Sequence, residues 1–238
     1  MDGFDHVAFG NLNEMRAAIG KETAAILVEP IQGEGGVRAA PAGYLKGLRQ
    51  IAEEFGLLLV YDEVQCGMGR TGKLFAHEWE GVPPDVMAIA KALGNGFPVG
   101  ACLASERAAV GMVAGTHGST FGGNPLAMAA GNAVLDMMLA PGFFERVDAM
   151  GRLLWEQLDA LVRSYPKLFA ELRGSGLLLG IRCVVPAADI TAKLRQNGLL
   201  TLTAGENVLR ILPPLIVGER ELEEALAVMH KVAAEWPV

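Results

Sequence analysis

Short apolar runs alternate with amphipathic stretches along the first half of the chain. Unbroken apolar runs occupy residues 24–28, 57–61 and 86–90. Runs of this length predict strands that are covered on both faces, as in a parallel sheet. Residues 44–55 carry apolar side chains at three- and four-residue spacing, which predicts an amphipathic helix. A fourth strand is expected at residues 99–103.

The second half of the chain has longer helical patterns. Helices are expected at residues 126–139, 143–165, 188–196 and 219–234, and strands at 176–181 and 208–211. Helices and strands mixed at this density predict a smaller α+β domain after the first, α/β part. The predicted domains are residues 1–140 and residues 141–238.

Composition narrows the class of protein. The chain has 238 residues, 20 Lys and Arg against 27 Asp and Glu, and 51% hydrophobic residues. These values exclude an intrinsically disordered chain, and a net charge of −7 without a basic cluster argues against nucleic-acid binding. No apolar run approaches the roughly 18 residues of a membrane span, and the first residues have no signal-peptide pattern. We expect a cytoplasmic enzyme or enzyme subunit without membrane or nucleic-acid partners.

Neither a metal site nor a disulfide framework is predicted. The three cysteines are too few and too scattered for either: Cys66, Cys102 and Cys183. The four histidines have no paired metal-ligand spacing: His6, His77, His117 and His230. Core or surface roles are expected for these histidines.

Three ionisable side chains stand where predicted strands end. Glu29, Asp62 and Lys91 follow the first three runs, about one strand–helix–strand unit apart. Ligands of open α/β sheets bind beyond the carboxyl ends of the strands. A lysine and a carboxylate at neighbouring strand ends suit imine chemistry, because the amine attacks a carbonyl and the carboxylate keeps a proton on a ring nitrogen.

The same residues also have simpler interpretations. A lysine after a strand is most often a solvated surface residue, and an aspartate there most often belongs to a turn or helix cap. The glycine-rich loop after Lys91 favours a site, because glycines let the backbone approach a ligand closely. Residues 118–125 offer hydroxyls and N–H groups for a phosphate, but a helix cap with a turn explains them equally well.

A nucleotide site is the weaker interpretation of residues 67–73. This segment matches G-x-G-x-x-G and the start of a P-loop, but Leu74 stands where a P-loop needs Ser or Thr. The acidic pair at residues 62–63 would also repel a pyrophosphate. We expect a glycine-rich active-site loop instead, with Arg70 and Lys73 on its surface.

Five motifs, in this order and across most of the chain, resemble a known family. They are residues 29–36 (EPIQGEGG), 62–65 (DEVQ), Lys91 with its glycine-rich sequel, 118–125 (GSTFGGNP) and 210–215 (RILPPL). The sequence is similar to the class III, or ω-amino acid, aminotransferases, which are pyridoxal phosphate enzymes of fold type I. The resemblance implies part of a large cofactor-binding domain with a mainly parallel sheet, an interdomain helix and a small C-terminal α+β domain.

The resemblance implies a role for each matching residue of the cofactor site. Lys91 would hold pyridoxal 5'-phosphate as a Schiff base and then act as the base and acid of the proton transfer. Asp62 would pair with the pyridinium nitrogen and keep it protonated. Gln65 would contact the phenolic oxygen of the ring, Val64 would pack on the ring face, and Glu63 belongs to the same cofactor-binding motif.

The resemblance also implies a homodimer and a pair of substrates. Thr120 would bind the phosphate of the partner subunit's cofactor, and Ser119 would lie beside the substrate. Arg210 would bind the α-carboxylate of glutamate or 2-oxoglutarate, for which a planar guanidinium is suited. Glu34 would pair with Arg210 while the ω-amino substrate is bound and swing away for glutamate. Glu29 is expected to support the cofactor-binding residues through hydrogen bonds.

The expected reaction is a ping-pong transfer of the terminal amino group of N-acetylornithine to 2-oxoglutarate, a step of arginine biosynthesis. Ornithine, succinylornithine and 4-aminobutyrate are alternative amino donors. Family members carry a long region before the position of Met1, so the other alternative is a non-catalytic fragment that needs a partner chain. Asn95 stands where the family favours glycine, and we expect it to accept a positive φ.

Overall fold

The structure is a computed structural model that describes residues 2–237. These residues form two compact units. The first holds the residues up to Pro30, residues 40–65 and residues 77–136, and the second holds residues 31–39, 66–76 and those from Met137 onward. The second unit thus includes two short segments from the first half of the chain, residues 31–39 and 66–76. The division into domains 1–140 and 141–238 stays a prediction.

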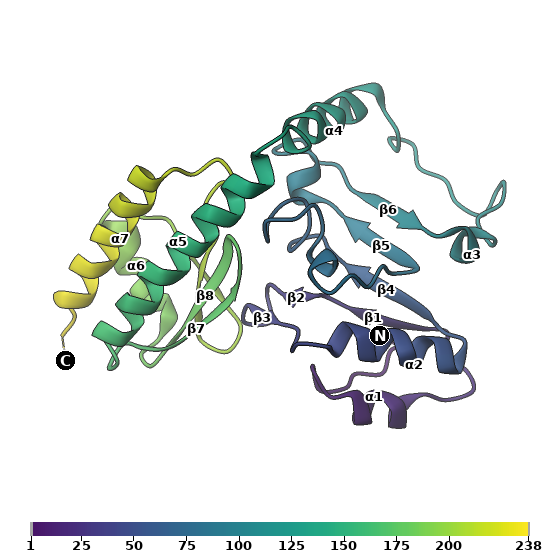
Figure 1. The fold of residues 1–238 in the computed structure, drawn as a ribbon, viewed down its shortest axis with the longest axis horizontal. Helices are drawn as coiled ribbons and strands as arrows, with labels where there is room; N and C mark the ends of the chain where they lie inside the picture. The colour runs from purple at the N-terminus through teal and green to yellow at the C-terminus, as the bar shows by residue number, and fades with distance from the viewer. Residues whose placement is uncertain (1, 238) are drawn as a thin grey trace. The chain divides into compact units, whose positions relative to one another are not determined.

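The first unit is built on a four-stranded sheet of order β1–β4–β5–β6 (Figure 1). The strands are β1 (Ala25–Val28), β4 (Leu58–Asp62), β5 (Val86–Ile89) and β6 (Ala101–Ala104). β1, β4 and β5 run parallel, and β6 runs antiparallel to β5. The mainly parallel sheet predicted from the apolar runs is therefore confirmed.

Buried side chains line one face of this sheet in register. Ile26 of β1 lies opposite Leu59 of β4, and Val28 lies opposite Tyr61. Tyr61 in turn lies opposite Met87 of β5, and all five side chains are buried. Because successive side chains of a strand point to opposite faces, this register puts the five on one side and builds a continuous apolar layer.

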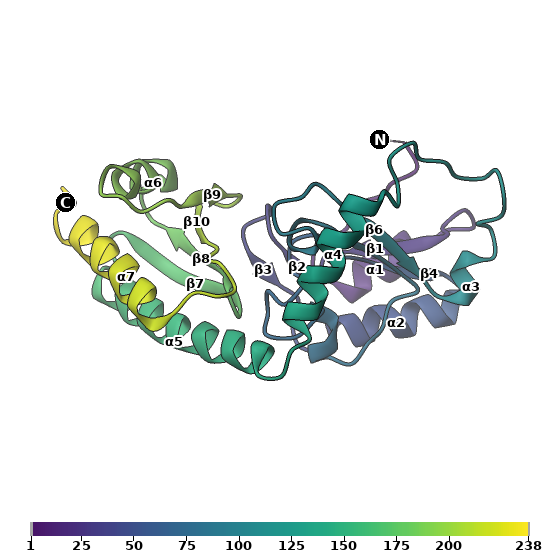
Figure 2. The ribbon, with the colours of Figure 1, turned by 90° about the horizontal axis from the view of Figure 1, so that it is seen from above.

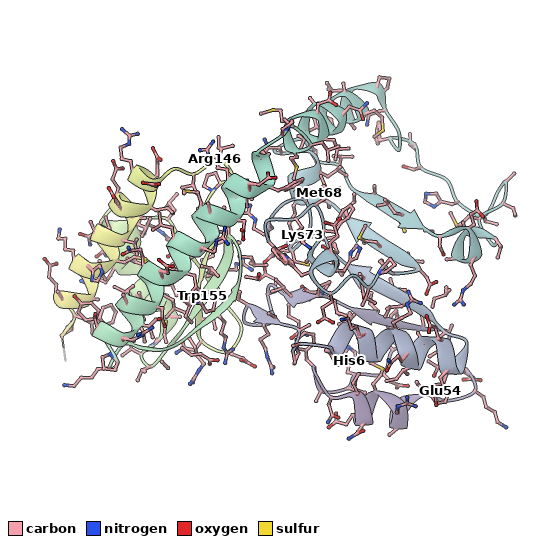
Figure 3. The ribbon with its side chains drawn as sticks, viewed as in Figure 1. His6, Glu54, Met68, Lys73, Arg146 and Trp155 are labelled. Carbon is pink, nitrogen blue, oxygen red and sulfur yellow. The ribbon has the colours of Figure 1, made fainter. Side chains whose placement is uncertain are left out.

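Helix α2 (Tyr44–Phe55) contacts β1 and β4. It presents a buried stripe made of Tyr44, Leu45, Leu48, Ile51 and Ala52. Gly56 ends the helix at a φ of +70°, a left-handed conformation that glycine adopts without steric cost. Helix α1 (Leu12–Ala18) lies beside α2, and Arg16 donates two hydrogen bonds of 2.8 and 2.7 Å to Glu54, which Figure 3 labels on α2.

The other face of β1 is open among the described residues. The structure buries only alternate side chains of this strand, and Leu27 is 58% exposed. Every residue of β6, at the sheet edge, is exposed as well. The expectation that residues 24–28 are covered on both faces is therefore wrong, because within residues 2–237 the packing covers one face of the strand.

The second unit holds an antiparallel sheet of order β7–β8–β10–β9. Its strands are β7 (Phe169–Ser175), β8 (Leu178–Cys183), β9 (Leu202–Ala204) and β10 (Val208–Ile211). Three helices join it: α5 (Phe143–Ser164), α6 (Ala187–Gln196) and α7 (Glu219–Ala234). Figures 1 and 2 both show α5 and α7 side by side.

The two faces of this second sheet have different partners. Leu179 and Ile181 of β8 and Leu209 of β10 share a core with the buried stripes of all three helices. The alternate residues Leu178 and Val208 point the other way and pack with Ile31, Val37, Cys66 and Ala76. The two short segments from the first half of the chain therefore cover the face that the helices leave open, and they bring residues of the β2–β3 hairpin (Ile31–Gln32 and Arg38–Ala39) to it.

The remaining elements connect these layers. They are η1 (Ala76–Trp79), η2 (Lys91–Leu93), α3 (Glu106–Ala109) and α4 (Pro125–Met138). Among residues 2–237 no single helix is long and apolar enough to cross a membrane, and α4 and α5 reach that length and composition only when they are counted together.

Asp85 fastens the starts of β4 and β5 to each other. Its Oδ2 accepts the Leu59 N–H at 2.8 Å, and its own N–H donates to the Leu59 carbonyl, also at 2.8 Å. Arg49 donates to the same carboxylate at 2.9 Å, and Arg107 lies 3.7 Å from it. Burial of Asp85 opposes its ionisation, but the Leu59 N–H and the two guanidinium groups outweigh burial and hold the pKa of Asp85 below its usual value.

We expect Asp85→Asn to lower the free energy of unfolding at pH 7 by about 2 kcal/mol, because it removes hydrogen bonds to a charged group. A carboxyl group whose pKa is lowered by folding stabilises the protein above about pH 4 and loses that effect as the pH falls through its folded pKa. The difference in the free energy of unfolding between the natural chain and Asp85→Asn should therefore shrink between pH 5 and pH 3. Urea titrations at each pH measure it.

The exposed pair Asp159–Arg163 provides the control, since Asp159→Asn removes a solvent-exposed helical ion pair. Such pairs contribute little, so this variant should stay within about 0.5 kcal/mol of the natural chain. A gap for Asp85→Asn that stays constant across this pH range would contradict the assignment.

Candidate functional site

Lys91 leaves the carboxyl end of β5 in a strained backbone conformation. Its φ is +47°, in the left-handed region that residues with side chains adopt rarely and that clusters at functional sites. Its carbonyl accepts the N–H groups of Gly94 and Asn95, both at 3.2 Å, which closes the turn η2. The residue is exposed. The fold thus fixes the main chain of Lys91 while its side chain reaches solvent.

The loop after Lys91 has room for glycine alone at position 94. A Cβ on Gly94 would collide with the carbonyl oxygen of Phe97 and would lie 2.7 Å from Val99 Cγ1. Asn95 follows with a φ of +43°, so the expectation that it accepts a positive φ is confirmed. This tight turn keeps the conformation of Lys91 from relaxing.

Asp62 is the last residue of β4 and lies opposite Ala88 of β5. Its Oδ1 accepts the N–H of Val64 at 2.9 Å, which orients the carboxylate, and the residue is half-buried. Adjacent strands lie about 4.8 Å apart, so Asp62 and Lys91 leave the same edge of one sheet from neighbouring strands. Glu29 follows β1 on the other side of β4. The structure brings together the three residues that were predicted from strand ends.

Glu63 is fully buried and bound to two other segments of the first unit. Its N–H donates to the carbonyl of Ala88 at 2.9 Å. Its Oε1 accepts the main-chain N–H of His77 at 2.9 Å and lies 2.9 Å from Nδ1 of the same residue. The ring of His77 lies 5.6 Å from that of Tyr61. Glu63 therefore holds the position of the β4 end beside Asp62, rather than reaching the exposed edge itself.

The glycine segment at residues 67–73 belongs to the second unit. Arg70 donates to the carbonyls of Pro213 at 2.5 Å and Leu177 at 3.3 Å, and burial lowers its pKa to about 10. A Cβ on Gly176 would lie 2.7 Å from Thr71 Cα, so the two backbones touch closely. The expectation that Arg70 lies on a loop surface is wrong, because its guanidinium supplies hydrogens to buried main-chain carbonyls.

Ser119 and Thr120 lie in an exposed segment before α4. Ser119 Oγ accepts the N–H of Gly122 at 2.8 Å, and Asn124 Oδ1 accepts the N–H of Ala127 at 2.9 Å in the first turn of the helix. The interpretation of this motif as a turn and helix cap is thus confirmed. A phosphate-binding role for Thr120 stays a prediction.

Glu34 and Arg210 meet in the second unit. Arg210 of β10 points to the face that the β2–β3 hairpin covers, because it alternates with Leu209 of the helix-side core. Its Nη1 lies 2.5 Å from Glu34 Oε1. Arg210 is only 6% exposed, whereas the side chain of Glu34 is 73% exposed. The ion pair expected from the family motifs is therefore present in this structure.

Comparison with known proteins identifies the family. Residues 4–233 match the family described as Aminotransferase class-III, and the chain belongs to it. Pyridoxal phosphate is the cofactor of these enzymes. Within residues 2–237 no group of three or more His, Cys, Asp or Glu side chains is arranged to hold a metal ion.

Particular relatives share most of this chain. Acetylornithine aminotransferase of Mesorhizobium japonicum is 56% identical over 226 residues, 95% of this chain and 57% of the relative. The crystal structure of acetylornithine aminotransferase from Elizabethkingia anophelis superposes with a TM-score of 0.92 at 35% identity and covers 98% of this chain and 60% of that one. Ornithine aminotransferase from Toxoplasma gondii gives a TM-score of 0.93 at 32% identity, over 98% and 57%. This chain thus spans 57–60% of each relative's length.

The residues at the edge of the first sheet fit this cofactor. The cofactor requires a primary amine for its carbonyl group and a carboxylate for its ring nitrogen. Lys91 and Asp62 supply these two groups from adjacent strands, and Gly94 keeps the backbone next to Lys91 free of side-chain atoms.

His77→Ala should lower the free energy of unfolding by about 1–3 kcal/mol, because the fully buried Glu63 carboxylate loses one of its hydrogen-bond partners. Chemical denaturation at pH 7 measures the change. The matched control is His6→Ala, which truncates an exposed histidine (labelled in Figure 3) and should leave the stability unchanged. Equal stability of the two variants would show that Glu63 does not depend on the His77 ring.

Proposed function

We propose that this chain is the cofactor-binding and C-terminal part of a pyridoxal phosphate aminotransferase. The observation that carries this proposal is the strained, exposed Lys91 at the end of β5, one strand away from the oriented carboxylate of Asp62. Left-handed conformations of residues with side chains are uncommon and cluster at functional sites, which supports a functional role for Lys91.

The residues of the first unit would divide the chemistry among them. Bound pyridoxal phosphate supplies a carbonyl that takes up the amino group and a ring that withdraws electrons from the reacting carbon. The amine of Lys91 would hold the cofactor and, once freed from it, would move a proton between the two carbons that flank the transferred nitrogen. Asp62 keeps the ring nitrogen protonated, because a carboxylate favours the charged form of its neighbour. Val64 and Gln65 hold the ring, and Glu63 fixes their strand end.

Arg210 would recognise the substrate that carries an α-carboxylate. Its guanidinium can form two parallel, charge-assisted hydrogen bonds with a carboxylate, which are stronger than those to a neutral group. When the amino donor is bound, Glu34 neutralises Arg210, and when glutamate or 2-oxoglutarate binds, the substrate carboxylate replaces Glu34. The exposure of Glu34 supports this exchange, because its side chain can turn into solvent without breaking a packed core.

We propose N-acetylornithine as the amino donor and 2-oxoglutarate as the acceptor, in arginine biosynthesis. The names of the relatives at 48–58% identity support this choice, since all of those compared are acetylornithine aminotransferases. Ornithine is the second candidate, because ornithine aminotransferases are among the similar solved structures. Succinylornithine and 4-aminobutyrate stay as further alternatives within the family.

The active form would be a homodimer in the cytoplasm, with Ser119 beside the substrate and Thr120 at the phosphate of the partner's cofactor. Exposed apolar side chains on the segment before α4 support a partner chain there: Val110, Met112, Val113 and Phe121. The alternative is a non-catalytic fragment that pairs with another chain. In either case Glu29 would support the cofactor-binding residues through hydrogen bonds. The non-catalytic fragment alone would show no turnover.

The visible absorbance of the chain tests the cofactor assignment. With excess pyridoxal phosphate the natural chain should turn yellow, and borohydride should fix the label on the peptide that contains Lys91. Lys91→Ala should stay colourless, whereas Lys73→Ala, in the glycine segment, should colour normally. A colourless natural chain would favour the non-catalytic alternative, and protection by ATP would favour a nucleotide site.

Glu34→Ala should change the balance between the two half-reactions, because Arg210 then carries an uncompensated charge when the amino donor binds. We expect the amino-donor half-reaction to slow about two- to fivefold relative to the glutamate half-reaction, the range for losing a partly exposed charged pair. Single-turnover kinetics with each substrate measure the ratio, and Glu22→Ala on the exposed surface serves as the control. Equal changes in both half-reactions would contradict the exchange of Glu34.

A further inference from the structure

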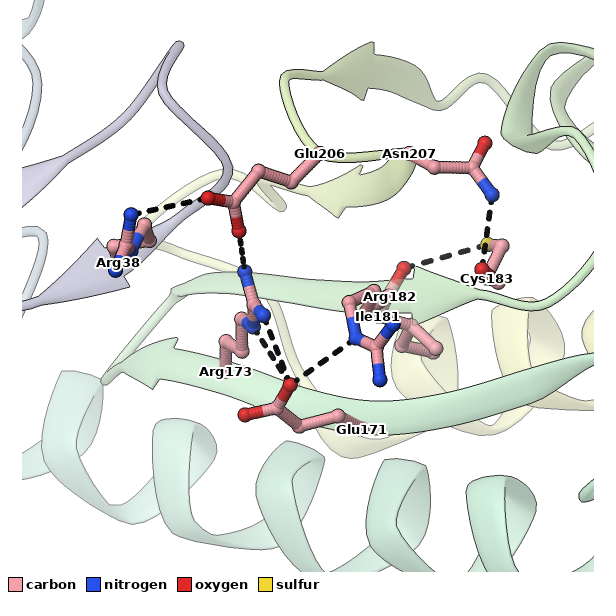
Figure 4. A network of polar contacts seen from close by, with 8 residues as sticks. All are labelled: Arg38, Glu171, Arg173, Ile181, Arg182, Cys183, Glu206 and Asn207. Atoms are coloured by element: carbon pink, nitrogen blue, oxygen red, sulfur yellow. Dashed lines mark hydrogen bonds and ion pairs between the residues drawn. The ribbon is translucent and has the colours of Figure 1, made fainter.

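Five charged side chains form a chain of ion pairs on the second unit (Figure 4). Glu206, in the turn between β9 and β10, accepts hydrogen bonds from Arg38 at 3.0 Å and from Arg173 at 2.5 Å. Arg173 also pairs with Glu171 at 2.9 Å, and Glu171 pairs with Arg182 at 3.3 Å. Arg38 is the only one of the five on the β2–β3 hairpin, so Glu206 is the acidic residue that links the hairpin to the C-terminal sheet.

The hairpin main chain approaches the same turn closely. The N–H of Gly205 donates to the carbonyl of Glu34 at 2.8 Å. A Cβ on Gly36, whose φ is +107°, would lie 3.1 Å from the Gly205 carbonyl oxygen. On the other side of the hairpin, a Cβ on Gly180 would lie 2.8 Å from the buried side chain of Val37. The backbone on both sides of Glu34 is therefore fastened to the sheet.

The turn that carries Glu206 is itself rigid. Glu206 and Asn207 have φ values of +56° and +60°. The side chain of Asn207 holds this conformation, because it donates to the carbonyls of Cys183 and Val185 at 2.9 Å and accepts the N–H of Ala187 at 2.8 Å. The hydrogen bond from Arg173 holds the pKa of Glu206 below its usual value, so Glu206 is negatively charged at neutral pH.

We propose that Glu206 is a positioning residue for Glu34. Glu206 holds the hairpin through Arg38, so that only the side chain of Glu34 moves when a substrate carboxylate replaces it on Arg210. The inference rests on the proposed transamination, since the exchange at Arg210 has a purpose only when two kinds of substrate alternate. Without this link the hairpin would hold Glu34 less firmly beside Arg210, and Glu34 would compete less well with a substrate carboxylate.

Glu206→Gln tests the link, because it keeps the size of the side chain and removes its charge. Hydrogen exchange of the full chain should become faster across residues 31–39, at amides such as that of Val37, which donates to the carbonyl of Gly33. In the enzyme loaded with cofactor, the KM for glutamate should fall about two- to fivefold with little change in its kcat, since Glu34 then competes less well for Arg210.

Matched variants separate positioning from general stability. Glu171→Gln removes an acidic partner of Arg173 in the same network without touching the hairpin, and it should leave exchange at residues 31–39 unchanged. Arg38→Gln, an exposed residue at the other end of the link, should reproduce the effect of Glu206→Gln, and Glu206→Asp should restore part of it.

Equal exchange in Glu206→Gln, Glu171→Gln and the natural chain would overturn the proposal. So would faster exchange at residues 31–39 accompanied by an equal loss in both half-reactions. The exchange measurement needs no turnover, so an inactive chain with the expected exchange pattern would count against the proposed function while the link between Glu206 and the hairpin stands.

Discussion

The parallel register of β4 on β5 is the constraint on which the first unit depends. Asp85 forms hydrogen bonds with Leu59 where the two strands begin, and the N–H of Glu63 donates to the carbonyl of Ala88 where they end. Between these contacts the apolar layer around Tyr61 fixes the register, since a slip of one residue would turn buried side chains to the open face. The relation of Asp62 to Lys91 is a consequence of this register.

Much of the fold follows from apolar periodicity. The runs at residues 24–28, 57–61 and 86–90 became β1, β4 and β5. The apolar runs predicted these strands correctly, but in β1 only alternate side chains are buried. The strand β7 was missed because its sequence includes charged residues that pair on the sheet surface, so residues 169–175 contain no apolar run. The two short segments that join the second unit were missed for another reason: they are placed by tertiary packing.

Some candidate site residues could be predicted from local sequence patterns, whereas others depend on contacts between distant parts of the chain. Strand ends alone pointed to Lys91 and Asp62, because parallel strands deliver their carboxyl ends to one edge. Glu34 and Arg210 lie 176 residues apart, and only the family motifs related them. The spacing of the histidines did not predict the contact between Glu63 and His77. The burial of Arg70 could not be predicted either, because a glycine-rich sequence is compatible both with a ligand site and with close packing against another backbone.

The two sets of charges differ in how firmly the fold holds them, and the proposed transamination would use that difference. In the proposed reaction the Asp62 carboxylate and the main chain of Lys91 stay in place while the Lys91 amine moves. The hydrogen bond of Asp62 to the Val64 N–H and the glycine turn after Lys91 favour this arrangement. In the proposed exchange Arg210 would meet two partners in turn, which requires a fixed cation and a movable anion. Burial fixes the guanidinium, whereas the exposed carboxylate of Glu34 is fastened only through its backbone. The exchange at Arg210 therefore costs the rotation of one side chain rather than the rearrangement of a core.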